Sequence, residues 1–223
     1  MENLQRLNRE FENKSPEEVL TWAAHHFGMD QIALASSLGA EDQVLTDMLI
    51  TLDPQAIVFT LDTGRLPSEA YECMRATTAR YGFQYRVYSP NAVAVEKMVA
   101  EKGLDLFYEN VANRQLCCYV RKIEPLKRAL QGLKVWVCGL RRAQSVTRSD
   151  FEIVEWDKTN GLYKINPLVH WTEEQVWDYI KSRKVPYNKL HDQGYPSIGC
   201  APCTRAVKAG EDIRAGRWWW EHP

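Results

Sequence analysis

Short apolar runs and amphipathic helical patterns alternate along most of the chain, and this alternation restricts the fold more than any other feature. The apolar runs predict buried strands at residues 32–38, 56–61, 83–88 and 134–138. The helical spacing of apolar residues predicts helices at residues 41–52, 67–81, 92–102 and 114–130. Repeated strand–helix units favour an α/β fold, in which a mostly parallel twisted sheet is flanked by helices.

Two capping boxes predict where further helices begin. At residues 15–18 a serine is followed by proline at the first helical position and by glutamate at the third. At residues 172–175 a threonine and a glutamine repeat the pattern. Residues 151–154 and 162–168 are expected to be extended, and the chain is expected to be irregular beyond Pro186.

The loops that follow the first two predicted strands are the expected position of a ligand. Parallel sheets bind ligands beyond the carboxyl ends of their strands, where residues 36–39 and 62–64 lie. Backbone N–H groups at a strand–helix junction attract an anion, and Ser36 and Ser37 add hydroxyl groups. A plain strand–helix turn is the alternative for residues 36–42, because this segment has one glycine and two acids.

Length and charge limit the class of protein. A chain of 223 residues can bury one substantial core, so a single domain is expected over residues 1–223. Within it, we expect residues 31–170 to form the α/β core and residues 190–223 to form an irregular, basic C-terminal segment. The formal net charge of −1 argues against bulk electrostatic attraction to nucleic acid or to a membrane.

The sequence predicts a cytoplasmic protein. Its first residues are polar and show no secretory signal, and no apolar run is long enough to cross a bilayer. Because the cytoplasm is reducing, the six cysteines are not expected to form three disulfides.

Basic residues gather in two stretches that suit an oxyanion. Arg141, Arg142 and Arg148 follow a predicted strand. Four further cations lie near cysteines in the sequence: Lys122, Arg205, Arg214 and Arg217. Arginine makes planar, bidentate contacts with phosphate-like oxygens. Each cation taken singly is more often a solvated surface charge, but their clustering at strand ends favours anion binding.

Four cysteines in two close pairs carry the strongest local signal. Cys117 and Cys118 are adjacent, and Cys200 and Cys203 form a Cys-x-x-Cys pair. Adjacent side chains point apart, which is awkward for one tetrahedral zinc ion, whereas a cubane cluster offers separate iron atoms. An iron–sulfur cluster is the first interpretation, zinc the second and a redox disulfide between Cys200 and Cys203 the third. Packing without any ligand role is the remaining alternative.

Several sequence motifs point to a family. The chain has SSLGAEDQ at 36–43, LDTGRL at 61–66, CCYVRK at 117–122, GLRRAQS at 139–145, NPL at 166–168, WT at 171–172 and IGCAPC at 198–203. In this order the motifs resemble those of the assimilatory adenylyl-sulfate reductases, relatives of the phosphoadenylyl-sulfate reductases. The resemblance runs from about Ala33 to the last residue. It implies an adenine nucleotide α-hydrolase-like fold with a modified pyrophosphate-binding loop.

The resemblance also implies a set of site residues. The loop at 36–43 would hold the phosphosulfate end of the substrate, and residues 62–66 with Gly139 would shape the adenosine pocket. The expected substrate-binding residues are Ser36, Ser37, Leu38, Gly39, Asp62, Leu66, Lys122, Gly139, Arg141, Arg142, Arg148, Arg214 and Arg217. The expected ligands of a 4Fe–4S cluster, which typical phosphoadenylyl-sulfate reductases lack, are Cys117, Cys118, Cys200 and Cys203.

The implied activity is the thioredoxin-dependent reduction of adenylyl sulfate to sulfite and AMP in assimilatory sulfate reduction. A cysteine thiolate attacks the sulfur, AMP leaves, and thioredoxin releases sulfite from an S-sulfocysteine. The cluster is expected to organise the pocket rather than to cycle electrons. The family's nucleophile lies in a Glu-Cys-Gly-Leu-His tail, which we expect beyond Pro223, because Cys73 and Cys138 match buried packing cysteines instead. Residues 1–223 are thus expected to bind substrate and cluster without turnover, and a homo-oligomer is compatible with the family.

Three other interpretations stay open from the sequence. A phosphoadenylyl-sulfate reductase that keeps the cysteines would need extra cations for a 3′-phosphate. A non-catalytic nucleotide-binding iron–sulfur protein would account for the unmatched nucleophile. An ATP pyrophosphatase is disfavoured, because residues 36–42 differ from the Ser-Gly-Gly-x-Asp-Ser pattern of that group.

Overall fold

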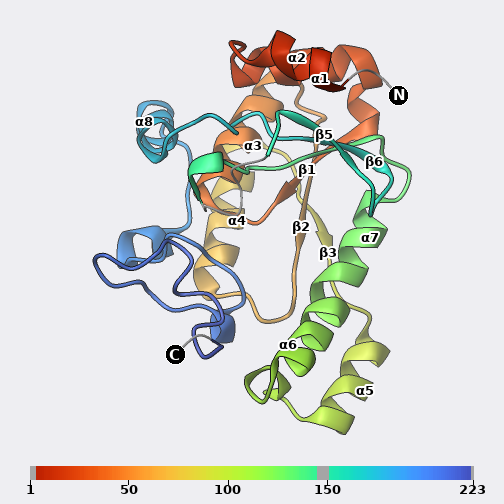
Figure 1. Cartoon of the computed structure of the whole chain (residues 1–223), viewed down its shortest axis with the longest axis vertical. Coiled ribbons are helices and arrows are strands. Elements are labelled where there is room, and N and C mark those ends of the chain that lie inside the picture. The colour runs from red at the N-terminus through yellow and green to blue at the C-terminus, as the bar shows by residue number, and fades with distance from the viewer. Residues whose placement is uncertain (1–3, 145–150, 222–223) are drawn as a thin grey trace.

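A six-stranded sheet lies between two layers of helices in the computed structural model, which describes residues 4–144 and 151–221 (Figure 1). The strand order is β3-β2-β1-β4-β6-β5. The strands are β1 (Ile32–Ser36), β2 (Ile57–Leu61), β3 (Arg86–Tyr88), β4 (Val135–Val137), β5 (Val154–Asp157) and β6 (Leu162–Ile165). Within the described residues, every strand pairing of the sheet is parallel except that of β5 with β6. The predicted α/β sheet is therefore confirmed.

Helices follow most of the strands. The α-helices are α1 (Leu4–Phe11), α2 (Pro16–Phe27), α3 (Ala40–Leu52), α4 (Ser68–Tyr81), α5 (Ala92–Lys102), α6 (Val111–Cys118), α7 (Glu124–Leu130) and α8 (Glu173–Arg183). Short 3₁₀ turns are η1 (Met29–Gln31), η2 (Leu106–Tyr108), η4 (Arg142–Gln144), η6 (Lys189–Gln193) and η7 (Ala201–Cys203), and η3 (Tyr119–Ile123) is a π-helix. Among the residues that the structure describes, no helix is both long and apolar enough to cross a bilayer.

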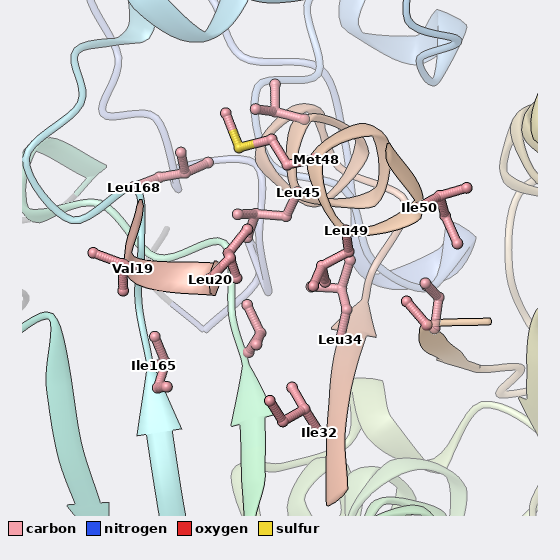
Figure 2. Close-up of a cluster of buried hydrophobic side chains, with 14 of the residues drawn as sticks. Val19, Leu20, Ile32, Leu34, Leu45, Met48, Leu49, Ile50, Ile165 and Leu168 are labelled. Carbon is pink, nitrogen blue, oxygen red and sulfur yellow. The ribbon is translucent and has the colours of Figure 1, made fainter. Parts of the chain in front are cut away.

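The larger core lies where α2, α3 and α8 pack against one face of the sheet (Figure 2). Leu34 of β1 and Leu45 and Leu49 of α3 are almost fully buried there, with Leu20 of α2 beside them. Each such leucine contributes roughly 2 kcal/mol of hydrophobic stabilisation. This burial holds α3, and therefore the loop that precedes it, firmly against β1.

The opposite face of the sheet is covered by α7. Phe59 of β2 and Ala33 of β1 pack there against Ala129 and Leu130, and all four residues are buried. Figure 1 shows α6 and α7 as one long green rod beside the sheet, with the blue C-terminal segment on the other side of the view. The C-terminal segment nevertheless packs onto α6, since Trp218 and Trp220 share an apolar cluster with Cys117.

The two predicted capping boxes are confirmed. Ser15 Oγ accepts the Glu18 N–H at 3.2 Å, and the Glu18 carboxylate accepts the Ser15 N–H at 2.8 Å. The same two reciprocal hydrogen bonds join Thr172 and Gln175 at the start of α8. These local bonds satisfy N–H groups that the first helical turn leaves without partners.

The predicted helix over residues 114–130 differs from the observed structure. It is divided into α6, the π-helix η3 and α7. Pro125 has no N–H, and its ring crowds the carbonyl group four residues earlier. The helix therefore widens to the i→i+5 hydrogen bonding of a π-helix just before this proline. The helix α1 was not predicted, and β5 begins at Val154, the last residue of the predicted extended run.

Candidate functional site

A cavity of about 500 Å³ lies at the carboxyl ends of three neighbouring strands, β1, β2 and β4. Its wall includes residues that follow each of these strands: Ser37 and Gly39, then Thr63, then Cys138 and Gly139. Because β1 pairs in parallel with both β2 and β4, the three loops meet at one edge of the sheet. The structure thus has a cavity where the sequence predicts a ligand.

Three of the predicted cations line this cavity, together with Arg65, Arg114, Arg121 and Lys164, and the three come from segments far apart in the sequence. Lys122 belongs to the π-helix, and Arg214 and Arg217 belong to the C-terminal segment. The pKa of Lys122 is lowered, first by desolvation inside the cavity and then by the charge of Arg217. Lys122 is nevertheless exposed to solvent. The cavity therefore favours an anionic ligand.

Arg217 is held in place by the loop that precedes the second cysteine pair. Its Nη1 donates to the Ile198 carbonyl at 3.2 Å, and its Nε is buried without a hydrogen-bond partner among the described residues. A Cβ atom at Gly199 would collide with the guanidinium group, so glycine is needed there for this close approach. The unpaired Nε leaves this cation with bonding capacity for a ligand.

The β1–α3 loop is organised around one buried carboxylate. Asp42 Oδ2 accepts the Ser37 N–H at 2.6 Å and the Ser37 hydroxyl at 2.7 Å. Asp42 Oδ1 accepts the Gly139 N–H at 3.2 Å, which joins the ends of β1 and β4. Burial is the largest cause of a raised Asp42 pKa, which lies at about 6, while the bonds from Ser37 act to lower it. The sequence showed Asp42 only as an acid close to the predicted anion.

The cations Arg141 and Arg142 have protein partners instead of cavity positions. Arg141 is buried, and its Nε lies 2.8 Å from Glu41 Oε1. Arg142 donates from Nε to the Phe151 carbonyl at 2.7 Å and pairs with Glu152 at 3.4 Å. Neither arginine is part of the cavity wall, so the structure does not bring these two predicted residues to the site.

The remaining predicted residues divide into three groups. Ser36 and Leu66 line the cavity. Leu38 and Asp62 are not part of the cavity wall. Leu38 packs in the core with 1% of its surface exposed. Asp62 Oδ1 accepts hydrogen bonds from the Gly64 N–H at 2.8 Å and from the Tyr71 hydroxyl at 2.9 Å. Arg148 lies outside the described residues. The predicted site is therefore brought together in part, by its loop, lysine and C-terminal arginines.

All four cysteines of the two pairs line the same cavity and are free thiols. Burial raises the pKa of Cys117, Cys118 and Cys203, the last to about 12. The charges of Arg121 and Arg114 act in the opposite direction on Cys117 and Cys118, respectively. Segments more than eighty positions apart in the sequence thus present four sulfur atoms to one cationic cavity.

Four thiols in one cavity are a donor set of the kind that soft metals and iron–sulfur clusters use. Within residues 4–144 and 151–221, no group of three or more His, Cys, Asp or Glu side chains is placed to hold one metal ion. The thiols nevertheless act on one another, since the charges of Cys117, Cys118 and Cys200 all raise the pKa of Cys203.

Hydrogen bonds fasten the second cysteine pair to the sheet. The Ala201 N–H donates to the Arg65 carbonyl at 2.8 Å, and Cys200 Sγ lies 3.2 Å from Thr63 Oγ1. Arg121 Nη1 donates to the Thr63 carbonyl at 2.8 Å from the other side. The loop after β2 therefore bridges the two cysteine pairs.

Two further residues were missed by the sequence analysis. Arg114 and Glu221 form a bidentate ion pair at 2.8 and 3.0 Å that ties the C-terminal segment to α6. Arg114 also lies over the Trp218 ring, 4.6 Å from its centroid, and Trp218 packs in the apolar cluster around Cys117. Opposite charges 107 positions apart give no local pattern that would have predicted the pair.

Comparisons with known proteins agree on one family. The model of the phosphoadenosine phosphosulfate reductase domain matches residues 31–206. A relative named adenosine 5′-phosphosulfate reductase from Allochromatium vinosum is 55% identical over 195 residues, which cover 87% of this chain and 76% of the relative. A relative of the same name from Burkholderia cepacia is 50% identical, covering 86% of this chain and 77% of the relative.

Solved structures show the same fold. A phosphoadenylyl-sulfate reductase from Candida auris, in a phosphate complex, superposes with a TM-score of 0.79 at 30% identity, covering 93% of this chain and 97% of the other. An FMN adenylyltransferase from Candida glabrata superposes with a TM-score of 0.60 at 15% identity, covering 96% of this chain and 73% of the other. At that identity the second likeness concerns the fold alone.

Proposed function

The chain belongs to the phosphoadenosine phosphosulfate reductase family, and on that premise we propose that it reduces adenylyl sulfate to sulfite and AMP in sulfate assimilation. One observation carries the proposal: the four cysteines and the cations Lys122, Arg214 and Arg217 line a single cavity at the carboxyl edge of the sheet. The relatives named adenosine 5′-phosphosulfate reductase support adenylyl sulfate as the substrate rather than its 3′-phosphorylated analogue.

The cations suit the charge that the reaction produces. When the bond between sulfur and the phosphate oxygen breaks, AMP leaves with the electron pair and its phosphate gains negative charge. We expect Lys122, Arg214 and Arg217, which line the cavity, to bind that phosphate and to stabilise its charge as it develops. The buried, unpaired Nε of Arg217 gives a donor that a ligand oxygen would satisfy after a small shift of the side chain.

We propose that a 4Fe–4S cluster is held by Cys117, Cys118, Cys200 and Cys203. The cluster would supply a fixed charge distribution beside the substrate and would organise the cavity. The protein residues around it have roles of their own. Arg121 and Arg114 favour the thiolate forms of Cys117 and Cys118 through their charges.

The proposed chemistry has two substitution steps. A cysteine thiolate attacks the sulfur of adenylyl sulfate, which releases AMP and leaves an enzyme S-sulfocysteine. The two thiols of thioredoxin then supply two electrons, release sulfite and become a disulfide. Cys73 and Cys138 do not suit the attack, because both are buried and burial raises the pKa of each thiol. We therefore assign the nucleophile to a cysteine other than the six of this chain.

Reconstitution tests this activity directly. The chain would be extended after Pro223 with a Glu-Cys-Gly-Leu-His tail, and sulfite would be measured with adenylyl sulfate, thioredoxin and a thioredoxin-reducing system. We expect sulfite release that depends on thioredoxin, and none from a matched tail in which serine replaces the cysteine. A cluster-loaded protein that binds adenylyl sulfate but stays inactive with the cysteine tail would favour a non-catalytic binding protein.

Substrate choice is tested by competition between the two nucleotides. We expect adenylyl sulfate to bind more tightly than phosphoadenylyl sulfate, because relatives that are 50% identical or more are named adenosine 5′-phosphosulfate reductase. Isothermal titration of the same anaerobic protein with each nucleotide, and with AMP as the shared fragment, measures the preference. Tighter binding of the 3′-phosphorylated nucleotide would assign the chain to the sister activity.

A further inference from the structure

The two C-terminal cations of the cavity wall lie on a segment with little regular structure. Arg214 and Arg217 follow η7, which ends at Cys203, and the described residues form no further helix or strand beyond it. An isolated bridge pairs Thr204 with Arg217. Because no helix or sheet fixes this part of the chain, the positions of both arginines depend on the side-chain contacts that the C-terminal segment makes.

The turn that follows Arg217 has an unfavourable backbone conformation. Trp218 has a φ of 49°, in the left-handed region that residues other than glycine seldom adopt. Its N–H donates to the Cys203 carbonyl at 3.3 Å, and its carbonyl accepts the Glu221 N–H at 2.9 Å. Such a conformation persists only where the surrounding structure holds it. The turn therefore needs an anchor on another element.

The side chain of Glu221 supplies an anchor at the end of this turn. Its carboxylate accepts hydrogen bonds from Arg114 Nε at 2.8 Å and from Arg114 Nη2 at 3.0 Å. The Glu221 side chain is 10% exposed and that of Arg114 is 16% exposed, so water and salt screen the ion pair little. Arg114 belongs to α6, and the pair thus ties the turn to a helix.

The Trp218 ring connects this ion pair to the cavity wall. Its centroid lies 4.6 Å from the guanidinium carbon of Arg114 and 5.2 Å from that of Arg217. Contact between a guanidinium group and an indole ring is favourable. A series of direct contacts therefore runs from Glu221 to Arg217 through the side chains between them.

The charges of the cavity wall oppose the docked position of the C-terminal segment. The charges of Arg217 and Arg214 both lower the pKa of Lys122, after the larger effect of desolvation. Desolvation and then the charge of Arg214 lower the pKa of Arg217. Like charges gathered where water is scarce repel one another. The attraction between Glu221 and Arg114 opposes this repulsion while no anion is bound.

We propose that Glu221 is a positioning residue: its ion pair with Arg114 holds the C-terminal segment so that the two arginines of that segment face the anion in the cavity. Glu221 is not part of the cavity wall, so its effect on the ligand passes through other residues. The inference rests on the proposed function only in taking AMP as a ligand of the cavity.

The substitution Glu221→Gln tests the proposal through the sign of its effect. By charge alone, loss of an acid near the cavity would strengthen the binding of an anion. If Glu221 positions the arginines, the docked fraction falls instead, and we expect AMP to bind about tenfold more weakly. Calorimetry measures both affinities on anaerobic samples of equal iron content per chain. Equal or tighter binding of AMP by the variant would overturn the proposal.

Glu124→Gln is the matched control, because it removes a bidentate ion pair that lies within α7. Glu124 pairs with Arg128 at 2.7 and 3.2 Å, and neither residue lines the cavity. We expect this control to leave the affinity for AMP within about twofold of the wild-type value. A loss as large as that in Glu221→Gln would mean that the effect is not specific to the anchor, which would also overturn the proposal.

A double-mutant cycle identifies the partner through which Glu221 acts. Arg114 itself lines the cavity, so Arg114→Met removes the anchor together with any direct contact to the ligand. In that background the carboxylate of Glu221 has lost its partner, and Glu221→Gln should cause no further loss of AMP affinity. A further loss equal to the one in the wild-type background would refute the coupling.

Limited proteolysis reports the position of the C-terminal segment without a ligand. Trypsin cleaves after arginine, and cleavage after Arg217 requires the turn at Trp218 to leave its site. We expect Glu221→Gln to release the peptide that begins at Trp218 about fivefold faster than the wild type, as measured by mass spectrometry. An unchanged rate would overturn the proposal. Failure of the wild-type protein to bind AMP would instead count against the proposed function, since the cleavage rate is measured without a nucleotide.

Discussion

Glu41 and Arg141 form an ion pair whose Nε–Oε1 distance is 2.8 Å, with 15% and 3% of the respective side chains exposed. The pair joins the first turn of α3 to the segment after β4, beside the bond from Gly139 to Asp42. Arg141 was expected to bind substrate, and the structure instead gives its guanidinium a protein partner. Arg141 thereby holds Glu41, a residue of the cavity wall, in place.

Replacing Arg141 by methionine should therefore lower stability more than ligand affinity. Removal of one partner leaves Glu41 as a mostly buried, unpaired charge, so we expect the free energy of unfolding to fall by about 3 kcal/mol. Urea denaturation measures the change. Arg142→Met is the control and should cost under about 1 kcal/mol, because its ion pair is largely exposed. A large loss of AMP affinity with unchanged stability would restore the substrate-binding assignment of Arg141.

Gly199→Ala should weaken anion binding by displacing Arg217. The added methyl group collides with the guanidinium, so we expect affinity for AMP to fall about tenfold, measured by calorimetry. A double-mutant cycle with Arg217→Ala identifies the cause. If Gly199 acts through Arg217, the alanine substitution has almost no further effect in the Arg217→Ala background; additive losses would refute this coupling.

Asp42 should make stability depend on pH in an unusual direction. Its pKa in the folded protein is about 6, above the ordinary value of 3.8, because burial disfavours the charged form. Between those values the folded state binds the proton more strongly, so stability from this group decreases as pH rises from about 4 to about 6. The full effect is up to about 3 kcal/mol. Subtracting the unfolding curves of Asp42→Asn isolates it, and a difference that stays constant across that range would contradict the raised pKa.

Cysteine substitutions should separate cluster ligands from other cavity thiols. Anaerobically purified protein is expected to be brown with about four irons per chain. Cys118→Ser should lose most of the iron and the colour, because serine is a poor ligand for the cluster. Cys138→Ser is the matched control, since Cys138 also lines the cavity but lies outside the two pairs. Iron retained in Cys118→Ser, or one zinc per chain in the wild type, would contradict the assignment.

Local patterns were reliable predictors where short-range physics decides the outcome. The alternation of apolar runs predicted the parallel strands, and Ser15 and Thr172 predicted helix starts that the capping bonds confirm. Each signal spans a few residues, because a cap needs only the side chain and the N–H groups of one turn. The same reasoning failed at the π-helix, where Pro125 changes the hydrogen bonding of the preceding turn.

The sequence by itself therefore determined the α/β class, the edge of the sheet where the cavity lies, and the four thiols with several of the cations that line that cavity. Only the tertiary structure decided which of these groups meet. It brought Lys122 and Arg217 to one cavity, paired Arg141 with Glu41, and directed Gly139 at Asp42. The physical reason is that these partners lie far apart along the chain. Their distance depends on how strands and helices pack, which no local spacing of residues encodes.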